Sequence, residues 1–529
     1  MAESGTTGAE PVFNRKLAIL LAMAMFVLVV DTSLMNVSIS AVVHDLDATV
    51  SGVQSAIALE ALVSAAFILI GGKVGDLIGR KRAYALGLCG YGVGALAMTF
   101  AQGLTAIIVF WAIIGGIGAA LLLPGMQSLI HGNFEGAAQK QVYALVGAAA
   151  AIAAAIGPLV GGFLTTAWSW RIGFLLEAVI IAVVLSGLGL VKDVPYTGPR
   201  RIDLVGATLS VLAMGGLVLG ILVWQEGGER VLALILVGVT AMAGLITWLR
   251  HCESQGKPAL LDTQLFRSPT FRLGISGQML QQIALGGAMI TLPIYLQMVL
   301  EYNALQAGLS LAPLSLSMFA LSALAGRRAG GRPPSGIIRW GFVLLLVGLG
   351  GLVLWIPRSD SGWDLVLPLI VVGSGLGLLV SQLNNYTLAP VSEERVSEAA
   401  AVNSASGSFG LSFGLAFAGA IMLASLSLLF TSAANDSEVL PSGDKEQVAQ
   451  ALEEDAQVMS NTALTEQLAG QPEDVRAEVV RINTEVRPRA LQVALMIPFL
   501  AALAGLVLSF RMSRIPVVTP TRSVEGLDL

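Results

Sequence analysis

Three acidic residues lie inside long apolar stretches of the chain, where a charged side chain is costly. They are Asp31, Glu60 and Glu177. An ionised carboxylate in a bilayer needs a partner or loses its charge, and such residues commonly mark a path for protons or substrate. Burial disfavours the ionised form of a carboxyl and a bound cation favours it. One group can therefore exchange a proton for a cationic substrate.

Structural roles for the same three residues remain open. Asp31 could hydrogen-bond within the first helix, and Glu60 could reach water from the outer part of the second. Glu177 could form an ion pair with Arg171, six residues before it. The sequence does not decide between these roles and proton or substrate exchange.

No other residues have the spacing of a catalytic or nucleotide-binding site. The sequence lacks the GxxxxGK[ST] pattern that cradles phosphates, which argues against ATP as the direct energy source. The three His and two Cys are scattered, without the spacing of metal ligands. We therefore expect a protein that is not an enzyme, with no cofactor, no metal ion and no nucleic-acid partner.

The composition identifies the elements that must position the acids. Of the 529 residues, 55% are hydrophobic and 12% charged, with a mean hydropathy of +0.78. Soluble domains carry about 25% charged residues. Because the apolar runs are continuous rather than alternating, we expect an all-α polytopic membrane protein. About fourteen transmembrane helices are predicted, at 17–41, 54–72, 83–101, 105–130, 139–166, 171–191, 202–223, 231–249, 272–298, 306–326, 336–356, 364–389, 399–430 and 489–510.

The basic residues predict the topology. Most of the 30 Lys and Arg fall in alternate loops, which places those loops and both termini in the cytoplasm. A weak internal repeat, with basic loops at 71–82 and 325–331, suggests two six-helix halves. We expect a cytoplasmic N-terminus at 1–16, an N-terminal six-helix bundle at 17–191, an inserted helix pair at 202–249, a C-terminal six-helix bundle at 272–510 with a long extracytoplasmic loop at 431–488, and a cytoplasmic tail at 511–529.

A short basic loop joins the second and third apolar stretches. We expect Asp76 to pair with Arg80 and to lie near a helix N-terminus, which favours an anion. Glycines here allow sharp turns and close helix contacts. The residues of interest are Gly72, Asp76, Gly79, Arg80, Lys81 and Arg82.

Neutral polar residues interrupt two later stretches. Gln278, Gln281 and Gln282 have the spacing of one helix face, and Asn384 and Asn385 fall in another predicted helix. Polar groups are costly against lipid, so they are candidates for the lining of a central cavity. Hydrogen bonding between helices is the alternative.

The long outer loop is strongly acidic. Its segments 444–459 and 462–486 have the composition of amphipathic helices, with a break near Gly470-Gln471-Pro472. We expect either a solvated cap without a substrate role or an electrostatic collar that attracts cations.

The motifs together resemble the major facilitator superfamily, in its fourteen-helix drug:proton antiporter branch (QacA- and EmrB-type). Gly72–Arg82 is similar to the superfamily's loop between helices 2 and 3. Asp31-Thr32 resembles the signature of helix 1, and Ser169-Trp170-Arg171 resembles the start of helix 6. The antiporter motif of helix 5 is matched by Gly157, Pro158, Gly161 and Gly162.

The resemblance implies a secondary transporter that works by alternating access. It would export hydrophobic or cationic drugs in exchange for protons, with the basic loop as a cytoplasmic gate and helix 5 controlling leak. An exporter of lipids or of a specialised natural product on the same fold is the alternative. The implied partners are a small hydrophobic molecule, protons and membrane lipid. The implied setting is a bacterial plasma membrane, with the protein a monomer.

One position departs from the family pattern. Helix 4 usually carries an Arg that is associated with proton transfer, and Ala112 stands at that place. We hypothesise that Glu60 or Glu177 replaces the usual acid–Arg couple.

Overall fold

The computed structural model describes residues 14–134, 136–193, 203–225, 228–257, 259–328, 333–391, 395–440 and 461–515. Within these ranges the chain is helical and contains no strand. Thirteen helices in the described part are long and apolar enough to cross a membrane. The remaining expected span, 83–101, is α4 (Arg80–Met98), which begins with three basic residues. The predicted all-α membrane fold is confirmed.

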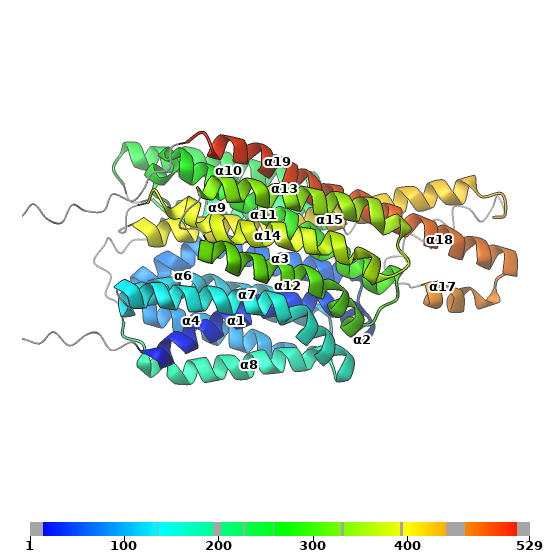
Figure 1. Ribbon diagram of the computed structural model, residues 1–529, viewed down its shortest axis with the longest axis horizontal. Helices are drawn as coiled ribbons and strands as arrows, with labels where there is room; N and C mark the ends of the chain where they lie inside the picture. Colours follow the sequence, from blue (N-terminus) through cyan, green and yellow to red (C-terminus); the bar gives the residue numbers. More distant parts are fainter. Residues whose placement is uncertain are drawn as a thin grey trace, which may run out of the picture.

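The first half of the chain forms a compact set of antiparallel helices (Figure 1). Trp170–Ser186, for example, forms α8 and packs on α1 and α4. The elements are α1 (Arg15–Val37), α2 (Ile39–Leu46), α3 (Val50–Ile78), α4 (Arg80–Met98), α5 (Leu104–Ala106), the π-helix η1 (Ile107–Gly115), α6 (Gly116–Asn133), α7 (Gly136–Ala167), α8 (Trp170–Ser186) and the short η2 (Gly187–Leu190).

The second half of the chain is also built of helices. Its helices are α9 (Leu204–Gln225), α10 (Val231–Ser254), the short η3 (Thr263–Arg267), α11 (Pro269–Ile294), η4 (Tyr295–Val299), α12 (Ala304–Arg328), α13 (Pro334–Trp355), the short η6 (Ile356–Arg358) and η7 (Gly362–Leu365), α14 (Val366–Leu388), α15 (Val396–Asp436), α17 (Asn461–Gln467), the short η9 (Leu468–Gly470), α18 (Glu473–Ala494) and α19 (Met496–Met512). The beginning of α1 and the end of α19 lie at the same end of the bundle (Figure 1).

Several helix boundaries differ from the sequence expectation, among them both ends of α3, the division of 489–510 between α18 and α19, and the ends of α1 and α15. The predicted helix at 17–41 ends at Val37, and α2 starts separately at Ile39. Ser38 lies between them, where its hydroxyl contacts Thr165 Oγ1 at 2.7 Å and donates to the Leu34 carbonyl at 2.8 Å. A hydroxyl that bonds back to the preceding turn competes with helix continuation. The helix α15 runs six residues beyond the predicted end at 430.

The helices α9 and α10 form an antiparallel pair on the side of the bundle. They pack against each other, and α9 also contacts α3 and α15. Asp203 holds the start of the pair, because its carboxylate accepts from Gly206 N at 2.8 Å and from Trp248 Nε1 at 3.0 Å. At the other end Gln225 Nε2 donates to Gln54 Oε1 of α3 at 2.9 Å. The division into two six-helix bundles with an inserted pair stays a prediction.

The segment predicted as a long extracytoplasmic loop contains a helical cap, which we define as α17, η9 and α18. Figure 1 shows α17, α18 and the end of α15 extending past the other helices. The predicted break near Gly470 is present, since η9 ends there and α18 begins at Glu473. The predicted helix at 444–459 lies outside the described residues.

Several hydrogen bonds fasten the cap to the second half of the chain, including those of Glu301 and Ser437. Glu301 accepts hydrogen bonds from Thr462 N at 3.0 Å and from Thr462 Oγ1 at 2.6 Å. Ser437, just after α15, donates to Glu478 Oε1 at 2.6 Å. Hydrogen bonds from Arg481 and Ser437 hold the pKa of the Glu478 carboxyl at about 2, below its usual 4.5.

Candidate functional site

Asp31 lies within α1 and is 1% exposed. Both of its carboxylate oxygens accept a hydrogen bond from Trp111 Nε1 at 2.9 Å. The hydroxyl of Tyr91, on α4, donates to Oδ2 of the same carboxylate. The hydrogen bonds of Asp31 join α1 to α4 and η1, so a structural role and a proton or substrate role both stay predictions.

A π-helix presents Trp111 to this carboxylate. Trp111 belongs to η1, the wide-turned segment that precedes α6. Such segments are rare and occur frequently at functional sites. The indole ring also packs edge-to-face on Phe174 of α8, with ring centroids 6.2 Å apart. Asp31 of α1 and Phe174 of α8 thus together fix the orientation of the Trp111 indole N–H.

Glu177 lies on α8 and is 2% exposed. Both carboxyl oxygens are buried and have no hydrogen-bond partner among the described residues. The expected pairing with Arg171 is absent: Arg171 instead forms an ion pair with Asp45 and donates to the Ala101 carbonyl at 2.6 Å. Glu177 interacts electrostatically with Asp31.

Glu60 completes the group from α3. Its side chain is half-buried, and it interacts electrostatically with Asp31 and with Tyr91. Tyr91 interacts electrostatically with all three predicted acids, and its hydroxyl donates to Asp31. We call Asp31, Glu60, Glu177 and Tyr91 the acid cluster. In the described part of the chain, no Lys or Arg forms an ion pair with any of its members.

The expected loop between the second and third spans is helical except at Gly79, because α3 runs through Gly72 and Asp76 to Ile78 and α4 begins at Arg80. We call the contacts around this junction the latch. Asp76 and Arg80 approach to 3.5 Å, as expected from their spacing. Lys81 N donates to Asp193 Oδ1 at 3.1 Å, and Lys81 Nζ donates to the Val191 carbonyl at 2.8 Å. These contacts tie the start of α4 to the segment that follows η2, and sequence reasoning did not identify Asp193.

Glycine makes the latch possible. Gly79 has φ +103°, a conformation that side-chain-bearing residues rarely adopt, and a Cβ there would lie 3.1 Å from Asp193 Oδ2. At Gly72 a Cβ would be in ordinary contact with Pro124, and Arg82 is exposed. Gly79 is thus the glycine that the turn requires.

The glycines of α7 allow close contact with two other helices. A Cβ at Gly157 would lie 2.6 Å from Ser33 Cβ, and one at Gly161 would lie 2.9 Å from Leu34 Cα, both on α1. A Cβ at Gly162 would lie 2.4 Å from the Ala304 carbonyl of α12.

The contact with α12 is reciprocal. A Cβ at Gly308 of α12 would lie 2.2 Å from the carbonyl oxygen of Pro158 on α7. The motif therefore places α7 between α1 and α12.

The amide residues of the second half separate into two environments. Gln281 is 1% exposed, whereas Gln278 and Gln282 are half-buried and lie beside Gly407 of α15. The three glutamines do not share one environment, although their spacing suggested one face.

The asparagines of α14 differ in their partners. Asn384 Oδ1 accepts from Asn403 Nδ2 at 3.1 Å, and Asn385 Nδ2 donates to the Ser381 carbonyl at 3.2 Å. Both are exposed, and their place in the lining of a central cavity stays a prediction. Asn403 is a further polar residue that the sequence interpretation did not include.

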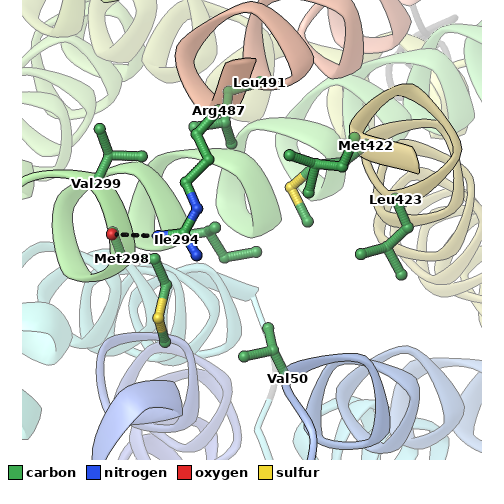
Figure 2. Close-up of a pocket in the computed structure, with 9 residues that line it drawn as sticks. Val50, Ile294, Met298, Val299, Met422, Leu423, Arg487 and Leu491 are labelled. Atoms are coloured by element: carbon green, nitrogen blue, oxygen red, sulfur yellow. Dashed lines mark hydrogen bonds between the residues drawn. The ribbon is translucent and has the colours of Figure 1, made fainter. Parts of the chain in front are cut away.

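A small apolar cavity lies where the cap meets the membrane helices (Figure 2). Arg487 of α18 reaches into it and donates to the Met298 carbonyl at 3.0 Å. Val50, at the start of α3, and Met422 of α15 lie on other sides of the cavity. No member of the acid cluster lines this cavity.

Comparison with known proteins identifies the class of this chain. Residues 21–415 match the family model of the Major Facilitator Superfamily. The "Probable actinorhodin transporter" of Streptomyces coelicolor is 27% identical over 447 residues, covering 82% of this chain and 77% of that protein. The "Multidrug export protein EmrB" of Escherichia coli is 27% identical over 394 residues, covering 73% and 76%.

The "Tetracenomycin C resistance and export protein" of Streptomyces glaucescens is 25% identical over 460 residues, covering 85% of this chain and 84% of that protein. Among solved structures, a bacterial homologue of the human lysosomal transporter Spinster, in an inward-facing and unoccupied conformation, has a TM-score of 0.63. It is 13% identical and covers 96% of this chain and 99% of that one, which supports the fold alone. The chain is a multi-pass membrane transporter, not an enzyme, and belongs to the Major Facilitator Superfamily.

Proposed function

We propose that this protein exports hydrophobic, often cationic, small molecules in exchange for protons, by alternating access. The observation that carries the proposal is the environment of Asp31, which is 1% exposed and held by two neutral donors, Tyr91 and Trp111. A buried carboxylate with neutral donors and no basic partner among the described residues can be neutralised by a proton or by a cation. Proton and cationic substrate then compete for the same charge.

The arrangement of the helices supports a mechanism in which this competition is coupled to movement. The acid cluster draws on α1, α3, α4 and α8, while α3 packs against α15 and α7 packs against α12. Asp31 and Glu60 therefore belong to helices that contact the second half, since α1 packs on α11 and α12 and α3 packs on α15. A change of charge in the cluster alters the solvation cost of exposing it, and so favours one side of the membrane over the other.

A specialised natural product is a second candidate substrate. Two of the relatives carry printed names that refer to actinorhodin and to tetracenomycin C, and both come from Streptomyces species. The half-buried Gln278 and Gln282 would suit a substrate with hydroxyl or carbonyl groups, because amides both donate and accept hydrogen bonds. We place the protein in a bacterial plasma membrane as a monomer, with both termini in the cytoplasm.

The first test is efflux of ethidium, and then of a neutral lipophile, from cells that express the protein. Wild type, Asp31→Asn and Asp47→Asn would be compared with and without a protonophore. Asp47 makes a matched control because it is exposed and has φ 48°, a conformation that Asn tolerates well. We expect protonophore-sensitive efflux in wild type and in Asp47→Asn, and its loss in Asp31→Asn. Efflux by Asp31→Asn at the wild-type rate and with the same protonophore response would contradict the proposal.

A further inference from the structure

We propose that Glu177 is a second proton-binding carboxyl, separate from Asp31, and that each transport cycle exchanges two protons for one substrate molecule. The inference rests on the proposed proton-coupled export. It adds to that proposal the proton stoichiometry and the residue responsible for the second proton.

The first support is the condition of the carboxyl group. Glu177 is 2% exposed and neither of its oxygens has a hydrogen-bond partner among the described residues. A buried polar group left without a partner costs about 1–3 kcal/mol, and an ionised one costs more. An apolar side chain of similar volume would pack there at no such cost. The carboxyl therefore reduces stability, and proton binding gives a reason for its presence.

The second support is the direction in which α8 presents this residue. Gly173, Glu177 and Ile181 are four residues apart and share one face of the helix. A Cβ at Gly173 would lie 2.0 Å from Leu34 Cδ1 of α1. One turn beyond Glu177, Ile181 Cγ2 lies 2.9 Å from the ideal Cβ position of Gly92 on α4.

These two contacts bracket Glu177. Leu34 follows Asp31 by three residues on α1, and Gly92 is the residue after Tyr91 on α4. The face that carries Glu177 is therefore directed into the junction between α1 and α4, where the Asp31 carboxylate accepts the Tyr91 hydroxyl. The electrostatic interaction between Glu177 and Asp31 agrees with this placement.

The titratable groups around Glu177 are all acidic or phenolic. Asp31 of α1 and Tyr91 of α4 interact electrostatically with Glu177, and Glu60 of α3 interacts with Asp31 and Tyr91. Trp111 of η1 contributes only a neutral N–H to Asp31. Two ionised carboxylates in this setting would repel each other without a cation to offset them, so at least one of the two carboxyls binds a proton when no cation is present.

The proton balance is simple. On one side of the membrane each carboxylate gains a proton and forms one O–H bond. On the other side both O–H bonds break and the two protons enter solution, while the substrate moves in the opposite direction. With a substrate of charge +1, such as ethidium, one net positive charge crosses per cycle. With Asp31 as the sole proton carrier the exchange would carry no net charge.

Membrane potential therefore distinguishes the two cases. Full-length protein would be reconstituted into liposomes with no pH gradient, and a potassium diffusion potential would be imposed while ethidium is followed. With two protons, wild type should shift the equilibrium ratio of ethidium about tenfold for every 59 mV, because one net charge moves. Glu177→Gln should lose this response to potential and still respond to a pH gradient. Glu229→Gln, at an exposed position, is the matched control and should behave as wild type.

Three results would overturn the inference. Wild-type transport of ethidium that ignores the potential excludes two-proton exchange without any variant. A potential response in Glu177→Gln equal to that of wild type assigns the second proton elsewhere. A response that requires Na⁺ at constant pH replaces the proton with a metal cation.

A second variant guards against a folding defect. Glu177→Met fills a similar volume without a charge, and should fold and show the same loss as Glu177→Gln. If Glu177→Gln is unstable and Glu177→Met keeps the full potential response, the inference fails. Loss of all proton dependence in wild type would instead contradict the proposed function, so the two failures are distinguishable.

Discussion

Trp111 Nε1 lies 2.9 Å from both carboxylate oxygens of Asp31, and the next residue along the chain is Ala112. Here the donor is neutral. The charge of Asp31 is thus left for a proton or a substrate to balance, which gives the indole N–H a direct role in holding the carboxylate without neutralising it.

Removing that N–H should reduce transport while keeping the ring contacts. Trp111→Phe preserves an aromatic ring against Phe174 but deletes the donor. Hydrogen bonds to charged groups contribute about 1.5–3 kcal/mol, so we expect the efflux rate to fall about tenfold or more. Efflux of ethidium, normalised to the amount of folded protein in the membrane, measures the effect. Wild-type efflux in Trp111→Phe would show that the indole has no part in the cycle.

Close packing of α7 on α12 should tolerate no added methyl group. In Gly162→Ala the new Cβ would lie 2.4 Å from the Ala304 carbonyl, and a backbone atom cannot move aside cheaply. Overpacking of this kind costs about 1–3 kcal/mol. We expect a lower thermal midpoint in detergent and slower efflux. Gly147→Ala, on the same helix with nothing within 4 Å, is the control. Equal midpoints for the two variants would refute the packing argument.

The latch at the basic loop depends on the carboxylate of Asp193. Asp193→Ala removes the acceptor for Lys81 N at the first turn of α4, where an anion is also favoured by the helix dipole. Loss of such a cap costs about 1 kcal/mol. We expect faster hydrogen exchange in the first turn of α4 and an efflux rate reduced several-fold. Asp193→Asn retains an acceptor oxygen and should fall between wild type and Asp193→Ala.

Acid should weaken the attachment of the cap through Glu478. The pKa of this carboxyl is lowered to about 2, chiefly by hydrogen bonds from Arg481 and Ser437. A lowered pKa means that the stabilisation is fully present above the usual value of 4.5 and is lost as the pH falls toward about 2. Hydrogen-exchange protection of α18, corrected for the intrinsic rate at each pH, should therefore be constant from neutral pH to about pH 5 and then decline.

The matching variants sharpen this test. Glu478→Gln should already show the reduced protection at neutral pH and should lose most of the dependence on acid. Glu466→Gln changes an exposed carboxyl elsewhere in the cap and should leave the profile of α18 unaltered. An acid profile in Glu478→Gln that matches wild type would assign the effect to other groups.

Much of the architecture could be predicted from the sequence because membrane helices are marked by long apolar runs. The three acids could be named for the same reason, as exceptions within those runs. Their convergence could not be predicted, because the partners of Asp31 lie 60 and 80 residues away on α4 and η1. No local spacing encodes which faces of separate helices meet, so Tyr91 and Trp111 remained unidentified.

The rejected pairing of Arg171 with Glu177 has a geometric explanation. The two residues are six positions apart on α8, which places their side chains about 120° apart around the helix axis and about 9 Å apart along it. Arg171 lies in the first turn and reaches Asp45, while Glu177 is turned into the protein. Nearness in sequence therefore suggested a partner that helical geometry excludes.

The cap has a practical consequence, because α18 leads into the last membrane helix with only Leu495 between them, itself in helical conformation. Thr462 is held by Glu301, close to the end of α11. A tilt of α19 or α11 would then be passed to a helix that extends past the other helices (Figure 1). A pair of spectroscopic labels, one on α18 and one on the α1–α3 connection, would report each turnover from the aqueous phase. No membrane-embedded residue would have to be altered.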